Sequence, residues 1–196
     1  MMEVRVSGQG EQPTLATERL LLRPLTDHDA VAISDGAGDP RVARYLIQVP
    51  SPYPVALARR WLRHRIDWWN EGKGVTLAIA LRPAPGNLIG TASLRRYQRD
   101  RRAELGYWLS SDQWGRGFVT EATTALVDYG FRELGLRRIY AQVLAGNDAS
   151  ERVLGKLGMT REGVKRQHVR KGRRLCDVAI YGLLRSEWTS DALDLD

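Results

Sequence analysis

A pair of glycines, Gly115 and Gly117, comes directly before a run of good helix formers in the segment DQWGRGFVTEA (112–122). The first backbone N–H groups of a helix have no partner inside the helix. Together with the helix dipole they form a binding site for an anion such as a phosphate. Glycine lets a bulky ligand approach this backbone closely, although glycines also serve ordinary tight turns. The segment therefore predicts an anion site whose meaning depends on the rest of the chain.

Strand and helix patterns surround this segment in a regular order. Helices are predicted from Thr26 to a break at GAGDP (36–40), over 53–72, from the glycine pair to Gly135, and over 147–158. Apolar strand patterns, bounded by turn residues, occupy 18–25, 75–81, 88–94, 102–110, 136–145, 161–169 and 176–184.

This order predicts an α/β domain built on one mixed sheet of about seven strands flanked by about four helices. The strand–helix–strand unit from Glu104 to Leu144 is the expected parallel pair, with its helix as a right-handed crossover. Ligands of such sheets bind at the carboxyl ends of the strands, where the glycine pair lies. We expect one domain over residues 15–188, a flexible leader over 1–14 and a short tail over 189–196.

The charge balance favours anionic partners. The 196 residues include 30 basic and 23 acidic side chains, a net charge of +7. Phosphorylated cofactors, nucleic acid and acidic protein surfaces all fit this excess. The local basic cluster from Arg166 to Arg174 is typical of a solvated hairpin tip, so nucleic acid is not the expected partner.

Several classes of site are excluded by composition. A single cysteine excludes an internal disulfide, and the three histidines are not at metal-ligand spacing, so no metal is expected. No apolar stretch is long enough to span a bilayer, and the polar N-terminus does not resemble a signal peptide. We expect a cytoplasmic protein without a membrane partner, as a monomer or homodimer.

Two longer segments, ELGYWLSSDQWGRGFVTEA (104–122) and LRRIYAQVLAGNDASERVLGKLGM (136–159), resemble one known family. Together with the final YGLLRSEW, they are similar in kind and order to the GCN5-related N-acetyltransferases (GNAT), especially the RimJ/RimL-type group that acetylates protein N-terminal amines. The resemblance covers roughly Thr17 to Trp188. It implies the GNAT fold, in which the parallel pair of a mostly antiparallel sheet is splayed.

The sequence departs from the family at two positions. Asp112 stands where the pyrophosphate signature begins with Gln or Arg, and Gln113 beside it is the alternative after a slip in register. Leu154 stands where many members carry the tyrosine that protonates the leaving thiolate. This leaves Ser150 for that role, as in the RimJ/RimL pattern.

The resemblance implies that acetyl-CoA is the cosubstrate and lies between the splayed strands. The pyrophosphate would bind the backbone N–H groups of the glycine segment and the Thr120 hydroxyl, which involves Gly115, Arg116, Gly117, Phe118, Val119 and Thr120. A backbone N–H of Trp108 or Leu109 would bind the thioester oxygen. Asn147, the cap of the next helix, would orient the cofactor arm, and Arg152 and Lys156 would meet the 3′-phosphate. For Arg116, Arg152 and Lys156 the alternative is an ordinary solvated side chain.

Acetyl transfer to an amine needs a base for the amine and an acid for the thiolate. Glu104 is the expected base, directly or through water, with a structural salt bridge to Arg95 or Arg96 as the alternative. Ser150 is the expected acid, with local hydrogen bonding in the first turn of its helix as the alternative.

The expected function is therefore acetyl transfer to a primary amine, with Glu104 and Ser150 as base and acid. The preferred acceptor is the α-amine of a protein N-terminus. The alternatives are a small amine such as an antibiotic or polyamine, or a non-catalytic module that binds acyl-CoA or nucleic acid.

Overall fold

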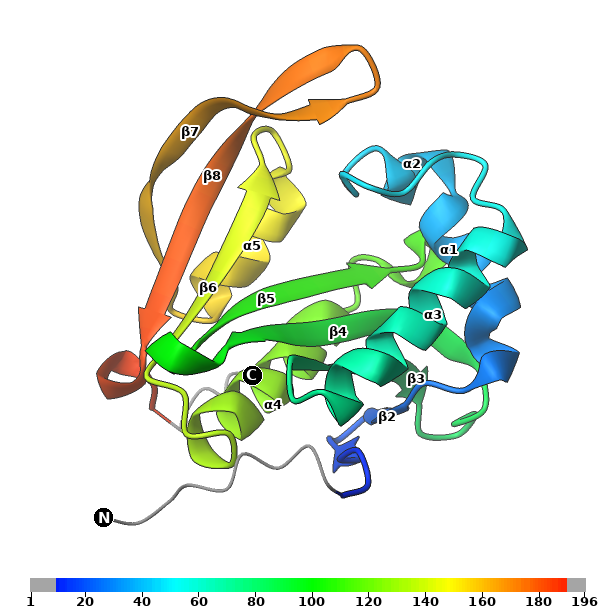
Figure 1. Cartoon of the computed structure of the whole chain (residues 1–196), viewed down its shortest axis with the longest axis horizontal. Helices are drawn as coiled ribbons and strands as arrows, with labels where there is room; N and C mark the ends of the chain where they lie inside the picture. The colour runs from blue at the N-terminus through cyan, green and yellow to red at the C-terminus, as the bar shows by residue number, and fades with distance from the viewer. Residues whose placement is uncertain (1–9, 190–196) are drawn as a thin grey trace.

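The computed structural model describes residues 10–189. Its centre is an eight-stranded sheet in the order β1-β2-β3-β4-β5-β6-β8-β7 (Figure 1). The strands are β1 (Leu15–Ala16), β2 (Leu20–Pro24), β3 (Gly74–Leu81), β4 (Leu88–Tyr97), β5 (Arg102–Leu109), β6 (Arg138–Leu144), β7 (Thr160–Lys171) and β8 (Arg174–Leu184). Neighbours are antiparallel except β5 and β6, which are parallel. The mixed, mostly antiparallel sheet is confirmed, and the two-residue β1 adds a strand that was not predicted.

The helices are α1 (Ala30–Gly38), α2 (Pro40–Ala43), α3 (Val55–Asn70), α4 (Phe118–Arg132) and α5 (Asp148–Lys156). The predicted break in the first helix is confirmed. Pro40 begins α2, and the Asp39 side chain accepts a hydrogen bond from the Arg41 backbone N–H at 2.8 Å. Because proline lacks an N–H and Asp39 caps the new helix, α1 cannot run on into α2.

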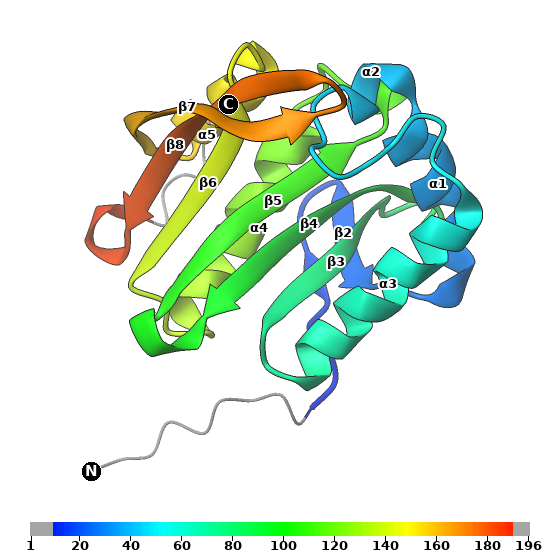
Figure 2. The same ribbon diagram turned by 45° about the horizontal axis from the view of Figure 1, so that its top comes forward.

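Helices cover both faces of the sheet (Figure 2). On one face, α1 and α3 pack on the sheet through a cluster that includes Leu62 and Trp108. On the other face, Leu126 of α4 and Leu154 of α5 join the main core cluster against strand residues such as Leu105. Because successive side chains of a strand point to opposite faces, Leu105 and Trp108 of β5 face different layers.

The sheet opens where β5 and β6 separate. Their parallel pairing begins at Arg102 and Arg138 and ends at Leu105 and Ala141. Beyond this point the two strands diverge, as the views show (Figures 1 and 2). The start of α4, the crossover between them, lies at this open end, as the sequence predicted.

The β7–β8 hairpin reaches over the open end toward the segment that follows α2 (Figure 2). Near its tip, the Lys171 ammonium donates hydrogen bonds to the backbone oxygens of Leu46, at 2.5 Å, and Val49, at 3.4 Å. These contacts join two segments that are far apart in the sequence.

Candidate active site

A cavity of about 930 Å³ lies at the gap between β5 and β6 and extends to α3. Every residue predicted for catalysis or cofactor binding lines it, except Arg116. The predicted residues that line it are Glu104, Trp108, Leu109, Gly115, Gly117, Phe118, Val119, Thr120, Asn147, Ser150, Arg152 and Lys156.

The glycine pair has the backbone conformation that only glycine adopts easily. Gly115 has a φ of 76° and Gly117, which precedes the first residue of α4, has a φ of 79°. Both values lie in the left-handed region, where a Cβ is disfavoured. No heavy atom comes within 4 Å of a Cβ built on Gly115, so a larger side chain there would enter open space at the cavity wall. The start of α4 thus faces the cavity with its free N–H groups.

Glu104 is held by neutral hydrogen-bond donors. Its carboxylate accepts from the Gln142 amide at 3.1 Å and from the Tyr140 and Tyr97 hydroxyls at 3.4 and 3.5 Å. Burial raises the pKa of Tyr140, and contact with Tyr97 and Glu104 raises it further, so the phenol stays protonated and remains a donor.

The alternative role of Glu104, an ion pair with a neighbouring arginine, does not occur among the described residues. Arg95 is directly opposite Glu104 on β4, but its guanidinium lies over the rings of Trp68 and Tyr97, each 5.4 Å from the guanidinium carbon. Arg96 is the next residue along the strand and points to the other face. Glu104 is therefore free of the salt bridge that would give it a purely structural role.

Ser150 lies on α5 beside a tyrosine that sequence reasoning missed. The Tyr107 hydroxyl is 2.7 Å from Ser150 Oγ, and burial raises the pKa of Tyr107 to about 12. Asn147 caps α5 as predicted, because its side chain accepts from the Ser150 N–H at 3.3 Å. Tyr107 lies between Leu105 and Leu109 on the apolar face of β5. A tyrosine in such a position could have been identified from the sequence as a candidate site residue, because a buried phenol needs a polar partner.

The two polar groups lie on opposite faces of β5. Glu104 and Tyr107 are three residues apart on one strand, so their side chains alternate to different sides of the sheet. Both Glu104 and Tyr107 line the cavity, which therefore joins the two faces through the gap beside β6. A group threaded through the gap would have a carboxylate on one side and a hydroxyl pair on the other.

A protein-family model described as an acetyltransferase (GNAT) domain matches residues 19–160. The chain belongs to this family. The uncharacterized N-acetyltransferase p20 of Bacillus licheniformis is 36% identical over 89% of this chain and 98% of its own length. The ribosomal protein uS5-alanine N-acetyltransferase of Escherichia coli is 25% identical over 89% of this chain and 92% of its own length. The fold is shared with Mycobacterium smegmatis RimJ, solved in complex with CoA-disulfide, at a TM-score of 0.80 and 22% identity, covering 93% of this chain and 90% of that chain.

The residues of this acetyl-CoA-dependent N-acetyltransferase fit a diphosphate at the start of α4. Gln113 lines the cavity, whereas Asp112 does not and instead accepts from the Gln113 amide at 2.9 Å. The side chain of Arg116 donates to Gln113 Oε1 at 2.8 Å and lies over the Phe118 ring. Of the two candidates for the family's polar residue, Gln113 is therefore the one that lines the cavity, whereas Arg116 does not line it and contacts two residues that do.

Residues on α5 also line the cavity of this acetyltransferase. Arg152 and Lys156 are one turn apart and exposed, and both line the cavity. Leu154, which replaces the family's tyrosine, is fully buried in the core. A tyrosine hydroxyl from this helix is thus absent from the cavity, and Tyr107 brings one from β5 instead.

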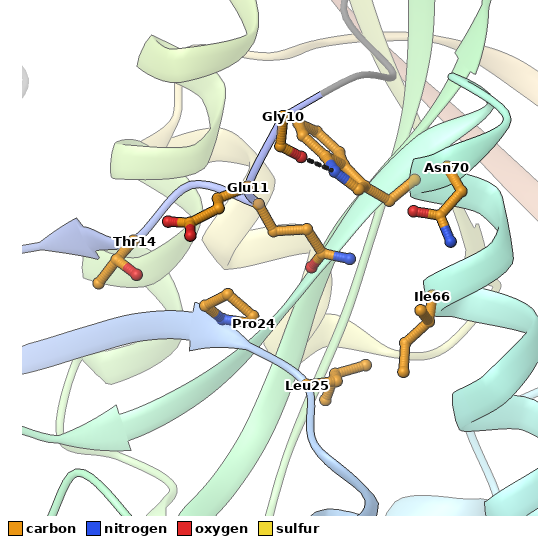
Figure 3. A pocket seen from close by; sticks show the side chains of 9 residues that line it. Gly10, Glu11, Thr14, Pro24, Leu25, Ile66 and Asn70 are labelled. Carbon is orange, nitrogen blue, oxygen red and sulfur yellow. Dashed lines mark hydrogen bonds between the residues drawn. The ribbon is translucent and has the colours of Figure 1, made fainter.

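A second pocket, of about 400 Å³, lies apart from these residues (Figure 3). It is formed by the segment 10–14, the end of β2 and the last turn of α3, where Trp69 Nε1 donates to the Gly10 oxygen at 3.0 Å. This segment is the described part of the predicted leader; residues 1–9, and 190–196 of the predicted tail, lie outside the described residues. None of the predicted catalytic or cofactor residues lines this pocket.

Within residues 10–189, no group of three or more His, Cys, Asp or Glu side chains is placed to hold a metal ion. Likewise, none of the helices described is both long and apolar enough to cross a membrane.

Proposed function

We propose that this acetyltransferase acetylates the α-amine of a protein N-terminus, with Glu104 as the base and Ser150, backed by Tyr107, as the acid. The observation that carries the proposal is the placement of a carboxylate and a hydroxyl pair on opposite faces of β5 within one cavity. A base and an acid on opposite sides of a threaded thioester suit the two proton transfers of the reaction.

Bound acetyl-CoA supplies an acetyl thioester, whose carbon forms a bond to the amine nitrogen while its bond to sulfur breaks. Glu104 takes the proton that the nitrogen loses, directly or through one water. Ser150 gives a proton to the sulfur and draws one from Tyr107 through their hydrogen bond, and the Tyr107 oxygen takes its proton back from water in the cavity. The pKa of Tyr107, about 12, means that this phenol starts the reaction protonated at neutral pH and readily regains the proton that it loses.

The oxygen of the thioester needs a backbone donor at the gap. Ser110 donates its N–H to the Ile89 oxygen at 2.8 Å, on the β4 side. Because N–H groups alternate along an antiparallel ladder, that of Trp108 also points to β4 and that of Leu109 points toward β6. We therefore assign the donor to Leu109 rather than to Trp108, whose ring packs in the cluster with α1 and α3.

A single carboxylate favours an α-amine over a lysine side chain. An α-amine has a reference pKa of about 7.7–8.0, against about 10.4 for lysine, so a modest base at neutral pH suffices for it. Among the described residues that line the cavity, Glu104 is the only carboxylate. The E. coli relative that acts on ribosomal protein uS5 supports this choice. An enzyme that acts on ribosomal proteins would encounter them in the cytoplasm, so we propose that this enzyme acts there.

The test is a screen of N-terminal peptides against small amines, read as release of free CoA thiol. Mass spectrometry then locates the acetyl group on the α-amine or on a lysine. Acetylation of peptide α-amines above lysine side chains is the expected result. Turnover of polyamines or antibiotics alone, with no peptide acetylated, would replace this acceptor class by the small-amine alternative.

A further inference from the structure

Two arginines share one tryptophan ring on the α3 side of the cavity. The guanidinium carbon of Arg65, from α3, is 3.9 Å from the ring centroid of Trp68, and that of Arg95, from β4, is 5.4 Å from it. Both arginines and the tryptophan line the cavity. In the fold, α3 packs beside β3 on one face of the sheet (Figure 2), and the Trp68 ring is the place where the Arg65 and Arg95 side chains meet.

Neither arginine has an acidic partner within residues 10–189. The salt bridges and side-chain hydrogen bonds of the described residues include no contact of Arg65 or Arg95 with a carboxylate. The Nε of Arg65 is buried without any acceptor. Burial lowers the pKa of Arg65, and the nearby positive charge of Arg95 lowers it further. A buried donor of this kind ordinarily has an acceptor, so Arg65 is open to an acceptor from outside the chain.

The position of Arg65 and Arg95 relative to Glu104 indicates which part of an acceptor they would contact. Arg95 and Glu104 are directly opposite on β4 and β5, and side chains in such a pair begin about 5 Å apart. An amine held at Glu104 therefore has its nearest substituents beside Arg95, whose guanidinium shares the Trp68 ring with that of Arg65. Arg44 is a further positive charge in the cavity lining. Such a surface repels polycations and attracts anions.

We propose that Arg65 and Arg95 bind a carboxylate of the acceptor that lies within a few bonds of its amine. The planar guanidinium presents paired N–H donors that match a carboxylate, and the flat face of Trp68 holds both forks in place. This inference rests on the proposed acetyl transfer to an α-amine and narrows the acceptor to an acidic one. The carboxylate has two sources: an acidic side chain in the first residues of a peptide, or the α-carboxylate of a free amino acid.

The experiment compares acceptors that differ by one charge. One pair of peptides carries Asp or Asn at the second residue, and a second pair is free glutamate and its α-amide. The acceptor KM is measured by CoA thiol release, and the acceptor Kd by calorimetry on enzyme saturated with CoA. We expect the acidic member of the matching pair to have a KM and Kd lower by about tenfold, the size of one charged hydrogen-bonded contact.

Variants connect this preference to the two side chains. Arg95→Gln and Arg65→Gln should each remove most of the charge preference, and Arg65→Lys should retain part of it. Arg99→Gln is the control, because Arg99 is exposed in the turn between β4 and β5 and does not line the cavity. Unchanged melting temperatures would show that the variants fold.

Preference for the Asp peptide over the Asn peptide supports the inference and identifies a peptide side chain as the source of the carboxylate. Preference for glutamate over its α-amide also supports it and identifies the α-carboxylate of an amino acid as the source. Equal binding and acetylation of both members of each pair would overturn it, as would arginine variants that weaken both members alike. In that result the arginines only brace Trp68, while the proposed function stands. Charge-dependent acceptor binding without acetylation of any amine would instead overturn the proposed function and keep this inference.

Discussion

The Tyr107 hydroxyl of β5 lies 2.7 Å from Ser150 Oγ of α5. Tyr107 comes from the strand that also carries Glu104, and it is largely buried with a raised pKa of about 12. A phenol with this pKa is neutral throughout the range in which amines are acetylated. In the proposed function the pair is therefore the proton donor rather than the base.

Both hydroxyls are expected to matter for the chemical step. Ser150→Ala and Tyr107→Phe should each lower the single-turnover rate by about tenfold to a hundredfold, within the range of a positioned acid. The Kd for acetyl-CoA should change little, since proton donation belongs to the transition state. The measurements are single-turnover kinetics and calorimetric titration with acetyl-CoA.

The double variant tests whether the two groups form one relay. If they do, its rate should match that of the slower single variant, because residues that act as a unit are not additive. Multiplying effects, or a Tyr107→Phe enzyme with the full single-turnover rate, would separate Tyr107 from the acid and leave it as a packing residue.

The glycine cradle predicts a ligand-linked stability effect. CoA should raise the melting temperature, because a ligand that binds only the folded state stabilises it. Gly115→Asp should abolish this rise by placing an anion where the diphosphate would bind. Gly115 is the better position, since a Cβ on Gly117 would lie 3.3 Å from the Arg19 guanidinium, which would draw the new carboxylate aside.

The matched control is Gly172→Asp. Gly172 also has a positive φ, of 58°, but it lies in the turn of the β7–β8 hairpin with no heavy atom within 4 Å of a built Cβ. This variant should keep the full CoA-dependent rise. A rise of equal size in both variants would place the diphosphate elsewhere.

The Arg23–Asp29 pair predicts a pH-dependent stability. Asp29 is buried and accepts from both terminal nitrogens of Arg23, at 2.7 and 2.9 Å. Burial acts to raise the pKa of Asp29, but the hydrogen bonds from Arg23 and Thr26 outweigh it, so the pKa is lowered. Asp29→Asn should reduce the free energy of unfolding at pH 7 by about 3 kcal/mol, because it leaves a partly buried arginine unpaired.

The sign of the pH effect follows from the lowered pKa. The stability that the ionised carboxylate contributes is present above the unfolded pKa of about 3.9 and is lost as pH falls through the folded value. The difference between wild type and variant, measured by urea unfolding, should therefore shrink below about pH 4. Asp67→Asn, at an exposed position of α3, should change stability by less than about 0.5 kcal/mol. An equal loss at pH 7 and pH 3 would show that the charge of Asp29 is not the cause.

Local signals in the sequence predicted the parts of the site that local geometry decides. Gly115 and Gly117 mark the start of α4, and Asn147 caps α5, because caps and left-handed turns depend on a few adjacent residues. Tyr107 needed tertiary information, since its partner Ser150 is 43 residues away. The position of the Arg95 side chain also needed tertiary information. Its register opposite Glu104 favours an ion pair, but its guanidinium lies over the rings of Trp68 and Tyr97 instead.

Glu104 as the base predicts a rate that depends on pH in a particular way. Its carboxylate has neutral donors around it and no ion pair within residues 10–189, so Glu104→Gln should leave the fold and its hydrogen bonds largely intact. The variant should lose at least about tenfold in kcat/KM at neutral pH, where the acceptor needs a base. The loss should shrink as pH rises above the amine pKa of about 8, because the solvent then deprotonates the acceptor.

The measurement is a pH–rate profile for wild type and Glu104→Gln on the same N-terminal peptide, with melting temperatures as the check on folding. Glu18→Gln is the control, since Glu18 is exposed and does not line the cavity. A parallel loss at every pH would mean that Glu104 orders Tyr140 and Gln142 at the gap without taking the proton. In that case the amine would lose its proton to solvent, and the preference for an α-amine over lysine should persist, because the lower pKa of the α-amine alone supplies more of its neutral form.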